Sequence, residues 1–231
     1  MAWGALAGSS LVIGALLAVI RRWPGALIGG VLAFGAGALV SAVAYDLAQE
    51  GLEQSGPLAV AGGLALGAMS FYLANRLVHR IGGRDRAGGA GLPLALGALL
   101  DGVPEQAVLG IGLATGQGVS IALLAAIFIS NLPEAIGSAS DMISAGRSGR
   151  SVLGLWTAVA AVCAASTIGG FALAMVAGSQ AGGAINGFAA GALLVMLVDE
   201  MIPEARRKTG NWAGLVTVLG FALAAGLSQL T

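Results

Sequence analysis

The stretch Leu99–Gly110, LLDGVPEQAVLG, places two acids and a proline inside a run that is apolar enough to cross a membrane. Asp101 and Glu105 are four residues apart, with Pro104 between them, so a helix would carry both acids on one face. A charge at the centre of a bilayer costs about 2.5–3.5 kcal/mol on insertion scales, and intramembrane acids mark functional sites by default. The stretch therefore predicts a membrane helix with a polar site.

The composition of the whole chain is that of a membrane protein. Of its 231 residues, 57% are hydrophobic and 10% are charged, and the mean hydropathy is +0.91. Soluble domains carry about 25% charged residues, and a soluble chain of this size could not bury so much apolar surface. We expect an all-α polytopic membrane protein that forms a single transmembrane domain over residues 1–231.

Eight apolar segments are long enough to span a bilayer, for which a helix needs roughly 20 residues. Short breaks that are charged or rich in glycine and proline separate them, such as EGLEQSGP after the second and EARRKTGN after the seventh. The candidate spans are residues 3–20, 25–49, 57–78, 91–115, 118–144, 151–177, 181–203 and 211–230.

The basic residues predict how these spans are oriented. All eleven Lys and Arg residues fall in the first, third, fifth and seventh breaks, and the positive-inside rule makes those breaks cytoplasmic. We therefore expect eight crossings, with the N- and C-termini outside. The basic residues are Arg21, Arg22, Arg76, Arg80, Arg84, Arg86, Arg147, Arg150, Arg206, Arg207 and Lys208.

The second and seventh spans resemble each other at a constant offset of 154 residues, which also places Asp46 opposite Glu200. By the charge rule the second span runs outward and the seventh inward. This is the arrangement of an inverted repeat, a common plan of secondary transporters with substrate sites near the midplane. The identical residues are Phe34, Ala36, Gly37, Ala38, Leu39 and Glu50, matched with Phe188, Ala190, Gly191, Ala192, Leu193 and Glu204.

A second likeness, at an offset of 29, links DGVPEQ in the fourth span with SNLPEA in the fifth and pairs Glu105 with Glu134. In the fifth span, Ser130 and Asn131 precede Glu134 by four and three residues and would share its helix face. With Asp101, two neighbouring helices could offer three carboxylates, an amide and a hydroxyl to one site. Spans one to three and six to eight would flank these two central helices.

The prolines of these two motifs add a second source of oxygen ligands. Pro104 and Pro133 each remove one helix hydrogen bond, which would free the carbonyls of Leu100 and Ile129. Freed carbonyls beside carboxylates suit a hard cation. The alternative interpretation is that each proline only kinks its helix.

Six acids lie at some depth in the candidate spans, and no Lys or Arg lies mid-span to neutralise them. A buried acid without a basic partner is protonated, faces a water-filled cavity, or binds a cation. For any one acid, protonation and a hydrogen bond remain the alternative to a functional site. The six acids are Asp46, Asp101, Glu105, Glu134, Asp199 and Glu200.

With these motifs, the chain resembles the Zrt/Irt-like protein (ZIP) family of divalent metal transporters over essentially its whole length. That family typically carries His-Asn-x-Pro-Glu-Gly in the fourth span and His-x-x-Pro-Glu-Gly in the fifth, and bacterial members add an acidic pair late in the seventh span. The corresponding stretches here are DGVPEQ, SNLPEA and VDEMIPEA. The resemblance implies eight helices in a 3+2+3 inverted-repeat arrangement, an elevator-like motion, uptake toward the cytoplasm, and often a homodimer. It assigns the transport site to Asp101, Glu105, Ser130, Asn131 and Glu134, and the route to the cytoplasm to Asp199 and Glu200.

The sequence departs from the family at the ligands, because Asp101 and Ser130 stand where the family has histidines. The sixth span, AVCAASTIGG, also lacks the acid that a second metal would need. Imidazole favours zinc, whereas carboxylate, carbonyl and water suit Mn²⁺, Mg²⁺ or Ca²⁺, so an oxygen-lined site predicts relaxed selectivity. We expect Zn²⁺, Mn²⁺, Fe²⁺ or Cd²⁺ as the transported substrate and no cofactor. The single histidine, His79, is interpreted as a solvated residue at the end of the third span.

Two other functions stay open: a proton relay or the transport of another cation or solute on the same fold, and a homologue that does not transport. An enzyme is not expected, because no buried His could serve as a base and Ser140–Asp141 lacks a third partner. We expect a multi-pass protein of the cell (plasma or inner) membrane, with the lipid bilayer and the divalent metal ion as partners and no nucleic acid.

Overall fold

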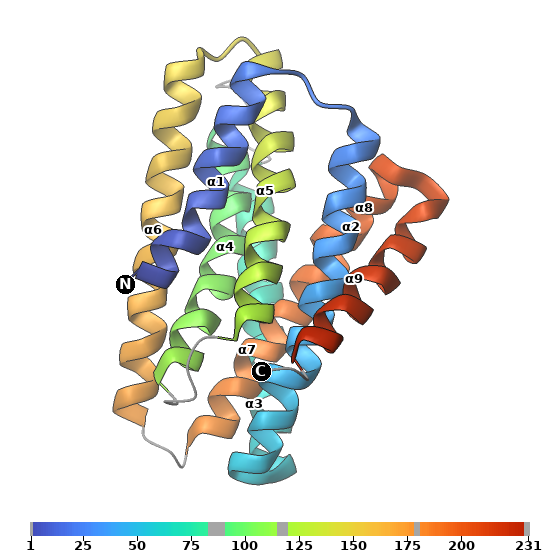
Figure 1. Cartoon of the computed structure of the whole chain (residues 1–231). Helices are drawn as coiled ribbons and strands as arrows, with labels where there is room; N and C mark the ends of the chain where they lie inside the picture. The colour runs from blue at the N-terminus through green and yellow to red at the C-terminus, as the bar shows by residue number, and fades with distance from the viewer. Residues whose placement is uncertain (1, 83–90, 115–119, 178–180, 229–231) are drawn as a thin grey trace.

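The computed structural model describes residues 2–82, 91–114, 120–177 and 181–228, and its described elements are all helices (Figure 1). Within these ranges, five helical segments are long and apolar enough to cross a membrane. The chain is therefore an α-helical membrane protein, as its composition predicts. The five segments are Ala2–Ile20, Gly25–Val78, Ile121–Ser144, Gly149–Ala177 and Gly182–Ser228.

The helices follow one another with few residues between them. The first half of the chain contains α1 (Ala2–Ile20), α2 (Gly25–Ala42), the π-helix η1 (Val43–Gln49), α3 (Glu50–Gly82) and α4 (Gly91–Ala114). The second half contains α5 (Ile121–Ser144), α6 (Gly149–Ala177), α7 (Gly182–Met196), the π-helix η3 (Leu197–Met201), α8 (Ile202–Thr209), the 3₁₀-helix η4 (Gly210–Trp212) and α9 (Ala213–Ser228).

Two of the expected breaks are helical, which corrects the sequence interpretation. At the second break the chain stays helical from η1 into α3, and the helical conformation is interrupted at Gly56, whose φ is 76°. Glycine tolerates this positive φ, and Pro57 directly after it suits the first turn of the helix that continues α3. At the seventh break α8 ends at Thr209, and Gly210, with φ 70°, caps it and begins η4, which leads into α9.

The helices pack in two sets. In one set α4 packs against α6, and α1 packs against both α5 and α6; in the other, α3 packs against α7 and α2 against α9. Figure 1 shows α1, α5 and α6 on the side of the molecule opposite α8 and α9. The sets meet where α2 packs on α5. This contact brings the fifth span, with its candidate ligands, against the repeat-related helices.

Glycines let the helix backbones of the second set approach closely, as small residues do at helix crossings in membranes. A Cβ atom built on Gly37 of α2 would collide with the carbonyl of Thr217 of α9, and one on Gly220 would collide with the carbonyl of Phe34. The α2–α9 crossing is therefore closed to larger side chains at these two positions.

The crossing of α7 with α3 uses equivalent residues. A Cβ on Gly191 would collide with the carbonyl of Leu64, and one on Gly67 with the carbonyl of Phe188. Phe188 and Gly191 are the residues that match Phe34 and Gly37 at the offset of 154. The sequence likeness between the second and seventh spans thus coincides with a likeness in how those spans pack.

The two π-helices also fall at equivalent places. Val43 and Leu47 of η1 lie 154 residues before Leu197 and Met201, the two ends of η3. Each π-helix contains one of the two acids that match at the offset of 154: η1 contains Asp46, and η3 contains Glu200. π-Helical turns are rare and frequently lie at functional sites, so both acids stand at unusual backbone positions.

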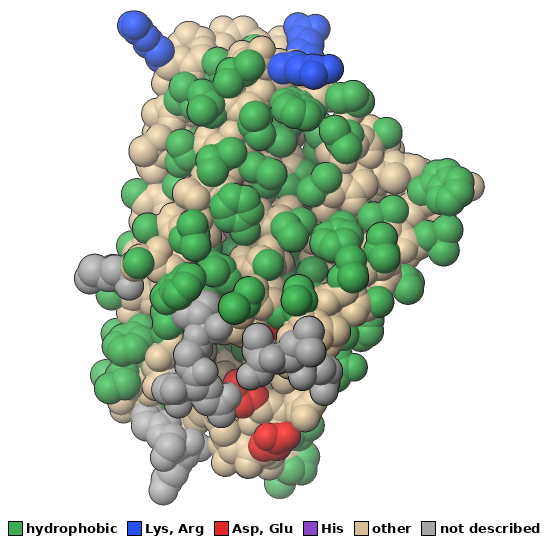
Figure 2. Space-filling view, viewed as in Figure 1, with side chains coloured by type: hydrophobic (Ala, Val, Ile, Leu, Met, Phe, Trp, Pro, Cys, Tyr) green, Lys and Arg blue, Asp and Glu red, His purple; other side chains and the backbone are tan. Residues whose placement is uncertain are grey.

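The surface of the bundle is apolar along its length, with charge at its ends. Figure 2 shows Lys and Arg side chains at one end of the visible face, acidic side chains near the other, and hydrophobic side chains between them. Large apolar side chains such as Leu58 and Val176 are each 89% exposed. A surface of this kind is stable in lipid, which agrees with an embedded protein.

Candidate functional site

Glu105 and Ser130 meet in the interior between α4 and α5. Their exposed fractions are 1% and 0%, and Ser130 Oγ lies 3.2 Å and 3.4 Å from the two carboxylate oxygens of Glu105. Ser130 Oγ also lies 3.0 Å from the carbonyl oxygen of Ile127. Because a hydroxyl has a single proton, it donates to one of these acceptors at a time. The pair joins the two central helices at the positions that the sequence predicts.

Asp101 and Glu134 face a cavity of about 700 Å³. Asp101 lies one helical turn from Glu105, and Glu134 one turn from Ser130. Asp101 Oδ1 is buried without a hydrogen-bond partner, and Glu200 lines the same cavity as Asp101 and Glu134. A large cavity with acids in its wall can hold water or a cation beside them.

Asp199 and Glu200 belong to η3 and line the same cavity. Asp199 is exposed and Glu200 is half-buried. Asn75 of α3, which the sequence interpretation did not include, donates from Nδ2 to Glu200 Oε1 over 2.7 Å. The acidic pair of the seventh span therefore shares one space with Asp101 and Glu134.

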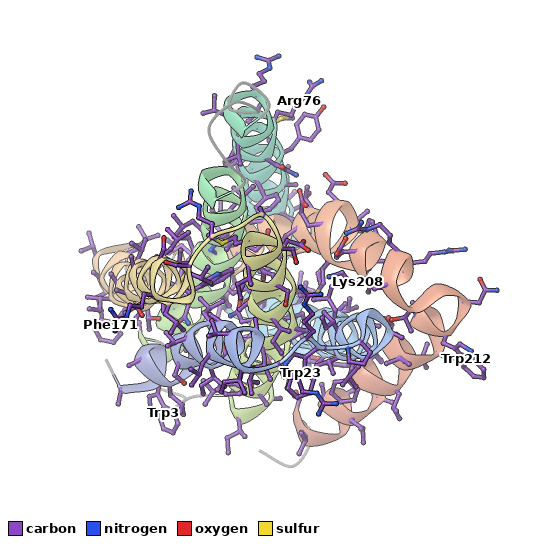
Figure 3. All side chains as sticks on the ribbon, turned by 90° about the horizontal axis from the view of Figure 1, so that it is seen from above. Trp3, Trp23, Arg76, Phe171, Lys208 and Trp212 are labelled. Carbon is purple, nitrogen blue, oxygen red and sulfur yellow. The ribbon has the colours of Figure 1, made fainter. Side chains whose placement is uncertain are left out.

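Basic side chains stand at another part of the cavity wall, on α8. Lys208 Nζ lies 3.1 Å from Glu204 Oε1, and Arg207 donates to the same carboxylate over 2.6 Å. A Cβ atom built on Gly137 of α5 would lie 2.8 Å from Lys208 Nζ. In Figure 3 Lys208 lies on the inner side of the bundle, whereas Trp3, Phe171 and Trp212 lie at its periphery. Asp141 completes this part of the wall.

The structure does not gather all the predicted ligands into one cluster. Glu105, Ser130 and Asn131 are outside the lining of the cavity that Asp101 and Glu134 reach. In the described ranges, no three His, Cys, Asp or Glu side chains are positioned to hold one metal ion. The reason is depth: residues four apart on a helix share a face but differ by about 6 Å along its axis.

Asn131 is 1% exposed, and its amide lies close enough to Glu105 to interact with that carboxylate, although neither of its polar atoms makes a hydrogen bond of ordinary geometry. Unsatisfied buried polar groups are rare in proteins and call for an explanation, such as water or an ion. Asn131 thus adds a buried amide beside the Glu105–Ser130 pair.

A further buried pair joins α4 to α6. Thr167 Oγ1 donates to Gln106 Oε1 over 2.8 Å, and the two residues are 2% and 0% exposed. Gln106 therefore has a buried hydrogen-bond partner on α6. The side chain of His79 and the residues Arg84 and Arg86 lie outside the described residues.

Comparisons of the sequence with known protein families and with curated proteins find no matching family model and no matching protein.

Proposed function

We propose that this protein transports divalent metal cations across the cell membrane toward the cytoplasm, as the resemblance to ZIP transporters implies. The observation that carries the proposal is the cavity of about 700 Å³ whose wall includes Asp101, Glu134, Asp199 and Glu200. Acids from the fourth, fifth and seventh spans share this space. A water-filled or cation-filled space is the environment that intramembrane acids require.

The chemistry of the lining suits a divalent cation as the transported substrate. Carboxylate, amide and hydroxyl oxygens line or adjoin the cavity, and these are the ligands of hard ions such as Mn²⁺. Zinc and iron also fit the proposal, because both bind most sites more tightly than manganese does, and cadmium is proposed with them as a further divalent ion. Binding would require the acids to move closer together than they stand here, since no three of the described ones form a cluster.

The proposed mechanism is an elevator-type motion of one helix set against the other. Eight crossings in a 3+2+3 inverted-repeat arrangement would make α1, α4, α5 and α6 the set that carries the site. The two equivalent glycine crossings and the two equivalent π-helices support the repeat. Inverted repeats permit alternating access, because each copy can adopt the other's conformation. A homodimer in the plasma or inner membrane belongs to the same proposal.

Metal uptake by cells that express variants tests this function. We expect Glu105→Gln and Glu134→Gln each to reduce uptake of Mn²⁺ and Zn²⁺ by at least tenfold, because each removes a carboxylate ligand. Glu53→Gln is the matched control, since Glu53 is an exposed acid outside the cavity. Unchanged uptake in both cavity-region variants would rule out the proposal.

Proton movement along the acids is the second candidate function. It is favoured by the dispersed arrangement, in which Asp101, Glu134 and Glu200 line one cavity and no three acids of the described residues form a metal cluster. Chains of intramembrane carboxylates are used for proton relay. Proton flux into proteoliposomes that is unaffected by Mn²⁺ or Zn²⁺ would favour this function over metal transport.

A further inference from the structure

Lys208 of α8 reaches across the boundary between the two helix sets. Its side chain is 19% exposed, and Figure 3 shows it on the inner side of the bundle. A Cβ atom built on Gly29 of α2 would lie 2.6 Å from the Cβ atom of Lys208, and one built on Gly137 of α5 would lie 2.8 Å from its Nζ. The two glycines therefore leave room for the lysine stem to pass from α2 to α5.

The ammonium of Lys208 adjoins the acidic face of α5. Glu134 precedes Gly137 by three residues and Asp141 follows it by four, so these three share one helix face, and all of them line the cavity with Lys208. The end of α5 near Asp141 is cytoplasmic by the positive-inside rule. A cation that leaves Glu134 toward that end passes the ammonium on its way.

Glu204 holds Lys208 in this structure but does not depend on it. Lys208 Nζ lies 3.1 Å from Glu204 Oε1, whereas Arg207 donates to both carboxylate oxygens of Glu204 over distances of 2.6, 2.7 and 2.9 Å. Glu204 thus keeps a cationic partner when Lys208 leaves it. Lysine carries a compact charge on a flexible four-carbon stem, so its ammonium can exchange one carboxylate for another.

We propose that Lys208 is a tethered cation that promotes release of the transported metal. Its ammonium stays with Glu204 while the metal cation occupies the cavity, and it turns to the Glu134 carboxylate as the metal leaves for the cytoplasm. This inference rests on the proposed function. The ammonium competes with the metal for the same carboxylate, and it returns a positive charge to an acidic cavity that has lost its ion. Because charges inside a protein are screened less than charges in water, it also opposes the return of a cation from the cytoplasm.

Metal binding to purified protein tests this role, because the loss of a competing charge tightens binding. Protein in detergent is titrated with Mn²⁺, and bound metal is measured at equilibrium. Lys208→Gln keeps most of the side-chain volume without the charge and should bind Mn²⁺ about tenfold more tightly than the wild type. A substitution that only damaged the fold would weaken binding instead. In cells the same variant should take up Mn²⁺ with a lower KM and a lower maximal rate, because release becomes slower.

Two further variants complete the test. Arg206→Gln removes a positive charge from an exposed position of the same helix, outside the lining of the cavity, so its Mn²⁺ binding should stay as in the wild type. Gly137→Ala places a methyl group against Nζ of Lys208. It should displace the ammonium from α5 and tighten Mn²⁺ binding, as Lys208→Gln does. Size-exclusion profiles report whether each variant remains folded.

The outcomes separate this inference from the proposed function. Folded Lys208→Gln protein that binds Mn²⁺ as the wild type does, or more weakly, would overturn the role of Lys208 while metal transport can stand. Equal tightening by Arg206→Gln would also overturn it, because net charge alone would then explain the effect. Should Lys208→Gln not fold, Gly137→Ala decides: tighter binding supports the role, and unchanged or weaker binding overturns it. Uptake that survives both Glu105→Gln and Glu134→Gln would instead remove the transport function itself.

Discussion

At the scale of single residues, the Glu105–Ser130 contact links the two central helices. Both side chains are buried, and the hydroxyl is the donor within reach of the Glu105 carboxylate. Removing a donor from a buried acceptor costs about 1–3 kcal/mol. We expect Ser130→Ala to lower the free energy of unfolding by that amount, measured as a lower midpoint of thermal unfolding in detergent.

Ser166→Ala is the control for this prediction. The hydroxyl of Ser166 donates to the carbonyl of Val162 within its own helix, α6, at an exposed position. Its removal should leave the unfolding midpoint nearly unchanged, because the Ser166 hydroxyl bonds only to a carbonyl of its own helix, and that carbonyl keeps its backbone hydrogen bond without it. Equal midpoints for Ser130→Ala and the wild type would show that the hydroxyl does not stabilise Glu105.

The sequence predicts which residues are polar in the membrane better than it predicts which of them meet. Helical spacing correctly brings Glu105 near the fifth span, but it also placed Asp101 in the same cluster, whereas Asp101 faces the cavity. The spacing of residues along a helix shows which of them share a face. It does not show the depth in the membrane at which the neighbouring helix begins. Asn75 was missed for a related reason: its importance comes from Glu200, 125 residues away in the chain.

At the scale of helices, glycine positions decide how closely α3 and α7 pack. Gly62 and Gly63 are adjacent in α3, yet a Cβ on Gly63 would collide with the carbonyl of Ala184 and one on Gly62 would meet open space. We expect Gly63→Ala to destabilise the protein by about 1–3 kcal/mol through overpacking. Gly62→Ala should instead stabilise it by up to about 1 kcal/mol, because alanine favours the helix.

Thermal unfolding of these two variants in the same detergent checks the crossing. Because the substitution is the same and the positions are neighbours, differences in expression or detergent binding are matched. Similar midpoints for Gly62→Ala and Gly63→Ala would contradict the close approach of α3 and α7.

Helix positions follow from hydropathy where a span is bounded by polar residues. The expected spans 3–20, 91–115 and 151–177 agree with α1, α4 and α6 to within two residues at each end. The π-helices and the helical second break could not be predicted in this way. They depend on hydrogen-bond register and on a turn at Gly56, and a hydropathy pattern contains neither.

At the scale of the whole molecule, the distribution of charge predicts how the bundle sits in the membrane. The positive-inside rule puts the end with Arg147 in the cytoplasm and the end with Glu53 outside. We expect a membrane-impermeant maleimide to label Glu53→Cys in intact cells and to label Arg147→Cys only after permeabilisation. The native Cys163 is 0% exposed and should add little background. The reverse labelling pattern would contradict this orientation and, with it, the proposed direction of transport.

The central claim, that acids from three spans hold a divalent cation in one cavity, is tested most directly by anomalous scattering. Crystals soaked separately in Mn²⁺ and Zn²⁺ would show where each ion binds. The account predicts an anomalous peak in the cavity beside Asp101 and Glu134, with the neighbouring carboxylates drawn toward it. Well-ordered soaked crystals with no peak in this cavity, or with peaks confined to the outer surface, would contradict it.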